Sequence, residues 1–125
     1  MLKNKIAVVT GANGGIGIEI IKLFHKNGAK LFACVRSESE EFKKVISELE
    51  KNSPNKIKII KMDLQNDESV KKAAKEITKS SESIDILVNN AGTILTSSFL
   101  MTPIEKIKDL FQVNFFSKIL FTQYI

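Results

Sequence analysis

Four short apolar runs recur along the chain. They lie at residues 5–10, 30–35, 57–62 and 84–88, and they are rich in isoleucine, valine and other apolar residues. The first contains Ile-Ala-Val-Val without polar alternation, which is typical of a strand that is buried on both faces of a parallel sheet. We therefore expect four β-strands.

Apolar residues at helical spacing separate these runs. The pattern occupies residues 16–27, 38–51 and 67–79, and a longer one runs from residue 103 toward the end of the chain. The order β-α-β-α-β-α-β-α implies right-handed crossovers and a parallel sheet with helices on both faces. The sequence therefore predicts an α/β fold of the doubly wound, Rossmann type, in one domain at residues 1–125.

The last predicted helix has a clear start but no clear end. Thr102 is expected to be its N-cap, with Pro103 at the first helical position and Glu105 completing a capping box. Residues 119–125 are mostly apolar, and no glycine, cap or polar tail follows them. We therefore expect a truncated domain.

Basic residues are spread over the whole chain. Lysine and arginine number 19 against 14 acidic residues, a net charge of +5, yet Arg36 is the only arginine. Proteins that read nucleic acids favour arginine and a localised patch, so we predict no nucleic-acid partner. The apolar runs are too short for a membrane span or a signal peptide, so we predict no membrane partner and a cytoplasmic location.

The chain has a single cysteine, Cys34, and a single histidine, His25. One thiol cannot form an internal disulfide, which fits a reducing compartment. These two residues are far apart and cannot assemble a zinc site. We therefore predict no metal site and interpret Cys34 as a small core residue.

A glycine-rich turn follows the first predicted strand, where residues 10–17 read Thr-Gly-Ala-Asn-Gly-Gly-Ile-Gly. Glycines allow a tight turn and a close approach of backbone N–H groups to a ligand, and the next helix directs its positive end at that ligand. The context predicts a dinucleotide pyrophosphate site in which a side chain at Gly15 or Gly17 would block the pyrophosphate. A purely structural turn is the alternative. The candidate cofactor-binding residues are Thr10, Gly11, Asn13, Gly15, Ile16 and Gly17.

Three further motifs follow in order along the chain. Asn-Asn-Ala-Gly at residues 89–92 comes directly after the fourth strand, Asp63 follows the third strand, and Asn114 lies in the last helix. Together with the Thr-Gly-x-x-x-Gly-x-Gly spacing of the turn, they resemble the N-terminal half of the short-chain dehydrogenase/reductase family. The resemblance implies the strand order 3-2-1-4. It also implies cofactor contacts from Asp63, Leu64, Asn90, Ala91 and Gly92, and a catalytic role in proton relay for Asn114.

These polar residues also have structural interpretations. Asp63 could cap the next helix near Asn66, and Asn89 and Asn90 could tie neighbouring strand ends together. Asn114 falls on the apolar stripe of its helix, where an amide without a partner costs about 1–3 kcal/mol. We favour a functional role for Asn114 and leave both interpretations open for Asn90.

The end of the second strand bears on the choice of cofactor. An acid there accepts hydrogen bonds from the ribose 2′-hydroxyl of NAD, whereas a nearby arginine accommodates the 2′-phosphate of NADP. Val35 stands in the place of the acid and Arg36 follows it. We predict NADP rather than NAD, with contacts from Ser37 and Ser39 and some opposition from Glu38. A solvated surface arginine is the alternative.

The resemblance implies an oxidoreductase that transfers a hydride between NADP(H) and a carbonyl or alcohol substrate, most similar to 3-oxoacyl-[acyl-carrier-protein] reductases. The family's Tyr-x-x-x-Lys is missing, because Tyr124 is the only tyrosine and one residue follows it. A dinucleotide-binding module without catalysis is the alternative, while the Asn-Asn-Ala-Gly run argues against a methyltransferase or nucleotide-sugar epimerase. The family also implies a homo-oligomer through the last helix, whose apolar residues almost surround it.

Overall fold

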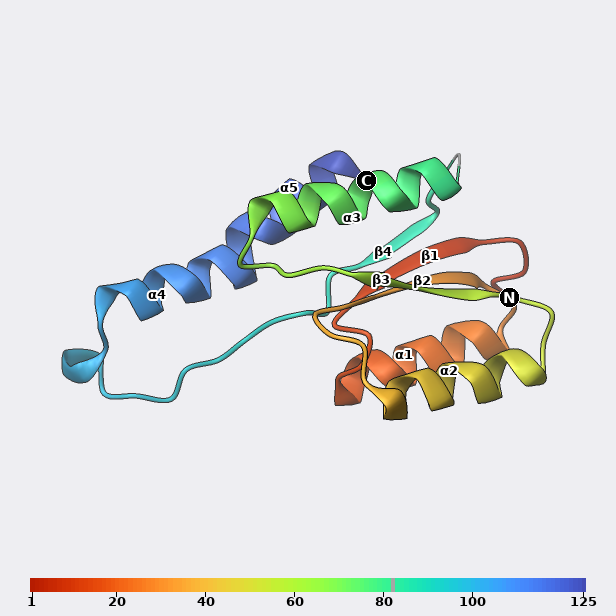
Figure 1. Cartoon of the computed structure of the whole chain (residues 1–125), viewed down its shortest axis with the longest axis horizontal. Coiled ribbons are helices and arrows are strands. Elements are labelled where there is room, and N and C mark those ends of the chain that lie inside the picture. Colours follow the sequence, from red (N-terminus) through yellow and green to blue (C-terminus); the bar gives the residue numbers. More distant parts are fainter. Residues whose placement is uncertain (82) are drawn as a thin grey trace.

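The computed structural model has one sheet of four parallel strands in the order β3-β2-β1-β4 (Figure 1). The structure describes residues 1–81 and 83–125. The predicted doubly wound α/β fold and its strand order are confirmed. The strands are β1 (Ile6–Thr10), β2 (Lys30–Val35), β3 (Ile57–Lys61) and β4 (Ile86–Val88).

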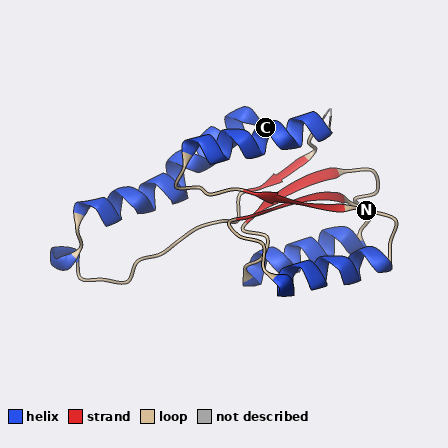
Figure 2. Cartoon of the chain, in the orientation of Figure 1, coloured by secondary structure: helices blue, strands red, loops and turns tan. Residues whose placement is uncertain are grey.

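Helices cover both faces of the sheet, two on each face (Figure 2). In the described part of the chain, none of them combines the length and apolar character that a membrane span needs. One face carries α1 (Gly15–Lys26) and α2 (Glu40–Lys51), and the other carries α3 (Asp67–Ser80) and α5 (Ser117–Tyr124).

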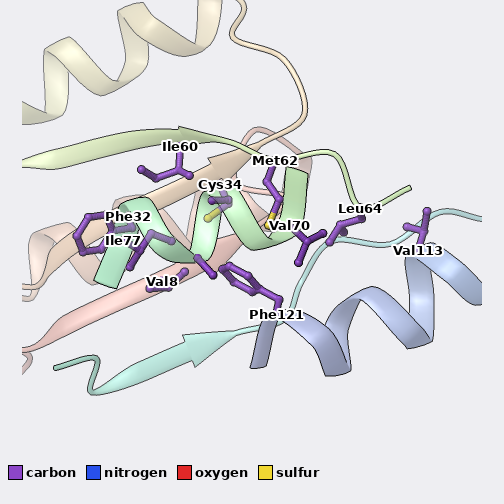
Figure 3. Packing of buried hydrophobic residues seen from close by; sticks show 12 residues of the cluster. Val8, Phe32, Cys34, Ile60, Met62, Leu64, Val70, Ile77, Val113 and Phe121 are labelled. Atoms are coloured by element: carbon purple, nitrogen blue, oxygen red, sulfur yellow. The ribbon is translucent and has the colours of Figure 1, made fainter. Parts of the chain in front are cut away.

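The central strand β1 contributes to a separate hydrophobic core on each face. Val8 belongs to the cluster beneath α3 and α5, whereas Ala7 and Val9 belong to the cluster beneath α1 and α2. All three side chains are fully buried, which explains why this run lacks polar alternation. Figure 3 shows the first cluster, in which Phe121 of α5 is completely enclosed.

The long last helix is continuous but irregular. It consists of α4 (Ile104–Phe111), the π-helical turn η2 (Gln112–Phe116) and α5. A π-turn widens the helix and shifts the faces on which later residues lie. A regular period places Phe111 and Phe121 on the apolar stripe of Asn114, and this prediction is wrong in part, since Phe121 is buried but Phe111 is 57% exposed.

The predicted capping box at the start of this helix is wrong. Pro103 is the N-cap, because its ψ of 144° is extended and the helix begins only at Ile104. The Thr102 hydroxyl instead donates to the Ser98 carbonyl oxygen at 2.7 Å, across the short 3-10 turn η1 (Phe99–Met101). This turn and the loop before it extend away from the sheet (Figure 1).

Parallel pairing brings the ends of all four strands to one edge of the sheet. Val9 lies opposite Val88, Thr10 opposite Cys34, and Cys34 opposite Ile60. The segments that carry the sequence motifs follow these ends directly, so they meet at the carboxyl edge. This is the edge at which doubly wound sheets bind ligands.

Candidate functional site

A cavity of about 580 Å³ opens at the carboxyl edge of the sheet, between the turns that follow the four strands. Most of the predicted site residues line it, and Thr10, Gly17 and Asn114 do not. The predicted residues that line the cavity are Gly11, Asn13, Gly15, Ile16, Arg36, Asp63, Leu64, Asn90, Ala91 and Gly92.

Gly11 is the sharpest point of the turn between β1 and α1. Its φ of +62° lies in the left-handed region, and a Cβ at this position would stand 2.8 Å from the Cα of Ala91. Only glycine meets both conditions without strain. The close approach holds the turn against the Asn-Asn-Ala-Gly segment, and both line the cavity.

The other two predicted glycines of the turn have different roles. A Cβ at Gly15 would have no atom within 4 Å, so this side of the turn is open, and Gly15 lines the cavity. A Cβ at Gly17 would stand 2.0 Å from the carbonyl oxygen of Gly11. The backbone of the turn therefore excludes a side chain at Gly17 by itself, which is a reason that the sequence did not predict.

The N-terminus of α1 differs from those of α2 and α3. Ser39 and Asn66 cap α2 and α3 with side-chain hydrogen bonds of 3.1 Å, and acidic residues occupy both first turns. The N-cap of α1 is Gly14, and the first turn of α1 contains no acidic residue. Free N–H groups and the helix dipole favour an anion, so the start of α1 is the one of these three helix N-termini that is suited to a phosphate.

Thr10 and Asn90 tie the ends of β1 and β4 together. The Thr10 hydroxyl donates to the Val88 carbonyl oxygen at 3.4 Å and accepts from the Ala91 amide at 3.0 Å. The Asn90 side-chain amide donates to the carbonyl oxygens of Thr10 and Gly11, both at 3.2 Å. The structural interpretation left open for Asn90 therefore holds in the geometry, although Asn90 also lines the cavity.

Asp63 organises the loop that follows β3. Its carboxylate accepts from the Gln65 amide at 3.0 Å, and its own amide donates to the Ser69 hydroxyl at 2.9 Å. Asn66, and not Asp63, is the N-cap of α3, so the helix-cap interpretation of Asp63 is wrong. Leu64 is 8% exposed and joins the core while lining the cavity.

Arg36 lies at the end of β2 with an exposed side chain at the cavity. Val35, in the place of an acid, is buried in the core. Glu38 forms an ion pair with Lys43 at 3.6 Å, and Ser39 caps α2. Two of the three neighbours that were expected to modulate Arg36, Glu38 and Ser39, therefore already have partners within the α2 region.

Asn114 lies in the π-turn η2 and is half-buried. Its Oδ1 accepts from the Thr93 amide at 2.8 Å, and its Nδ2 donates to the Thr93 carbonyl oxygen at 2.7 Å. Thr93 itself lines the cavity. The Asn114 side chain therefore holds the backbone of Thr93, which lines the cavity, without lining the cavity itself. Its Oδ1 and its Nδ2 each have a partner.

Comparisons with known proteins match the chain to one family. The family model described as short chain dehydrogenase matches residues 5–125. The chain belongs to the short-chain dehydrogenase family. It is 32% identical to the dehydrogenase/reductase SDR family member 7B of Danio rerio, over 99% of this chain and 41% of that protein. It is 33% identical to an uncharacterized oxidoreductase of Staphylococcus aureus strain MW2, over 91% of this chain and 48% of that protein.

The structure of a short chain dehydrogenase from Burkholderia cenocepacia J2315 in complex with NADP is also similar. Its TM-score is 0.89 with 28% sequence identity, and the match covers 98% of this chain and 50% of that one. The chain therefore spans half or less of the length of each of these three relatives.

Several residues that line the cavity at the carboxyl edge of the sheet are not among the sequence predictions. Gly14, Gln65 and Thr93 line it next to predicted residues, so adjacency to a motif was the signal that could have found them. Cys34 also lines it but is 1% exposed. Burial, with a smaller contribution from the Glu76 carboxylate, raises the pKa of the Cys34 thiol to about 12. The thiol is therefore protonated at neutral pH, in line with its interpretation as a core residue.

Proposed function

We propose that the protein is an oxidoreductase that transfers a hydride between NADP(H) and a small carbonyl or alcohol substrate. We also propose that the residues lining the cavity at the carboxyl edge of the sheet hold the dinucleotide. One observation supports the proposal above all: the turn of Gly11 and Gly15 and the acid-free N-terminus of α1 border the same cavity. Membership of the short-chain dehydrogenase family supports the reaction class.

Each part of the dinucleotide has a place in this proposal. Amides at the start of α1 would hold the pyrophosphate, Arg36 the 2′-phosphate, and Asp63 with Leu64 the adenine. The segment from Asn90 to Gly92 would border the nicotinamide ribose. When bound, the reduced nicotinamide would supply the hydride. We further propose that Asn114 serves the proton relay by fixing Thr93, which its amide grips at 2.7 and 2.8 Å.

The preference for NADP over NAD is part of the proposal. Its support is the exposed Arg36 beside the cavity and the buried Val35 in the place of an acid. The similar Burkholderia structure, which is in complex with NADP, adds to this support.

We expect these 125 residues alone to bind NADPH without reducing a carbonyl, because they lack a Tyr-x-x-x-Lys pair. Binding is measured by fluorescence titration, and turnover by NADPH oxidation with a panel of ketones, in parallel with the full-length protein. Turnover by the 125 residues would contradict this expectation. Binding without turnover in the full-length protein would instead favour the alternative of a non-catalytic dinucleotide-binding module.

A second copy of the chain is the partner that we propose for α4 and α5. The exposed apolar side chains of the long helix that α4, η2 and α5 form include Phe111 at 57%, Phe115 at 52% and Ile119 at 44% exposure. Several exposed aromatic and aliphatic side chains on one helix are typical of an interface between subunits.

We expect the protein to be oligomeric and Phe115→Asp to shift it toward the monomer, because the new carboxylate would have to be desolvated in the interface. Size exclusion with light scattering measures the mass. Phe99→Asp is the matched control, since Phe99 is 83% exposed on the loop before α4. A monomeric parent protein, or an equal effect of both variants, would contradict the proposed interface.

A further inference from the structure

A chain of polar side chains joins the π-turn η2 to the loop between β3 and α3. Ser117 is completely buried, and its hydroxyl is hydrogen-bonded to the Leu64 carbonyl oxygen. The Nε2 of Gln112 lies 2.8 Å from the Ser117 Oγ and 2.8 Å from the Asp67 Oδ1. Four residues from two stretches of the chain, residues 64–67 and 112–117, are therefore linked.

The direction of every bond in this chain follows from chemistry. A carbonyl oxygen only accepts, so the Ser117 hydroxyl must donate to Leu64. The Ser117 oxygen is then left to accept from Gln112, whose second amide hydrogen goes to the carboxylate of Asp67. The buried Ser117 hydroxyl has these two partners in one arrangement only, so the network defines the separation of the segments that it joins.

The segments joined in this way form two walls of the cavity. Leu64 lies in one wall beside Asp63, and Thr93 lies in the other. The π-turn that contains Gln112 also contains Asn114, which forms two hydrogen bonds with the backbone of Thr93. Both walls are therefore attached to the same stretch of the last helix, residues 112–117, which contains the π-turn and the first residue of α5.

We propose that Gln112 and Ser117 are positioning residues of the cofactor site. They hold the Leu64 wall at a fixed distance from the turn that holds the Thr93 wall. The inference rests on the proposed function, because it takes the ligand between the walls to be NADP(H). Neither residue lines the cavity, so both act through the backbone of the loop that follows β3.

The test measures the affinity of the full-length protein for NADPH and for adenosine 2′,5′-bisphosphate, which contains only the adenosine side of the cofactor. Gln112→Met keeps the length of the side chain but removes its hydrogen bonds. We expect it to weaken both ligands about three- to tenfold. Gln123→Met is the matched control, because Gln123 is exposed on α5, and we expect its affinities to equal those of the parent.

Asp67 provides a second, independent pair of variants at an exposed position. Asp67→Ala removes the acceptor of the Gln112 amide and should weaken both ligands, whereas Asp67→Asn keeps an acceptor oxygen and should restore the parent affinity. Both variants remove the same charge from the first turn of α3. The two variants therefore differ in whether residue 67 can accept the hydrogen bond from the Gln112 amide.

Melting temperatures of all variants are recorded with the affinities. A parent protein that binds neither ligand would overturn the proposed function and the inference with it. A parent that binds, with Gln112→Met and Asp67→Ala binding equally well, would overturn the inference alone. A lowered melting temperature with unchanged affinity would also overturn it, because the network would then serve stability only.

Discussion

Gly17→Ala is expected to destabilise the protein strongly, whereas Gly15→Ala leaves its stability close to that of the parent. A Cβ at position 17 would stand 2.0 Å from the Gly11 carbonyl oxygen and 2.9 Å from the Cα of Ala12. Both are backbone atoms within one tight turn, so neither can move without displacing the start of α1. We expect a loss of about 3 kcal/mol or more in the free energy of unfolding, a large part of the roughly 5–15 kcal/mol that a domain has.

Urea unfolding followed by far-ultraviolet circular dichroism measures this difference. Gly15→Ala is the matched control, because a Cβ at that position meets no atom within 4 Å. Gly15→Val should keep the fold but lose dinucleotide binding, since its branched side chain would occupy the open side of the turn at the cavity. A Gly17→Ala protein with the parent's unfolding midpoint would refute the steric argument.

Arg36→Asp is expected to shift the cofactor preference from NADP toward NAD by about ten- to a hundredfold. The exposed guanidinium at the end of β2 lies at the cavity, where it would form charge-assisted hydrogen bonds with a 2′-phosphate. An aspartate there would repel that phosphate and accept from a ribose 2′-hydroxyl instead.

The measurement is the ratio of the dissociation constants for NADPH and NADH in the full-length protein. Lys30→Asp is the control, because Lys30 is an exposed cation at the opposite end of the same strand. It makes the same change of net charge far from the carboxyl edge. Equal ratios in the parent and in Arg36→Asp would contradict the proposed contact between Arg36 and the 2′-phosphate.

The helical pattern around Asn114 predicted the burial of its amide but not the partner of that amide. Its spacing from apolar neighbours predicted a buried amide in need of a partner, and the structure provides two hydrogen bonds to Thr93. The partner could not be predicted, because Thr93 lies 21 residues earlier in the chain. The π-turn was also missed, since a regular period of 3.6 residues assumes the hydrogen bonds of an α-helix throughout.

The sequence by itself determined the fold class and the region of the site. The apolar run of β1 and the helical spacing around Phe42 are local signals, and the alternation of strands and helices leaves few topologies. The ends of parallel strands share one edge, so motifs that follow strands could be placed together before any contact was known.

Only the tertiary structure decided what each of these residues does. Gly15 and Gly17 belong to the same motif, yet one borders open space and the other is pressed against Gly11. Thr10 and Asn90 were candidates for ligand contact, and the structure shows that both join β1 to β4 while Asn90 also lines the cavity. The physical reason is that the hydrogen bonds of Thr10 and Asn90 join segments about 80 residues apart, and the clash at Gly17 depends on how the backbone folds back through the turn. Periodicity and spacing describe neither, because they record only the order of residues along a regular element.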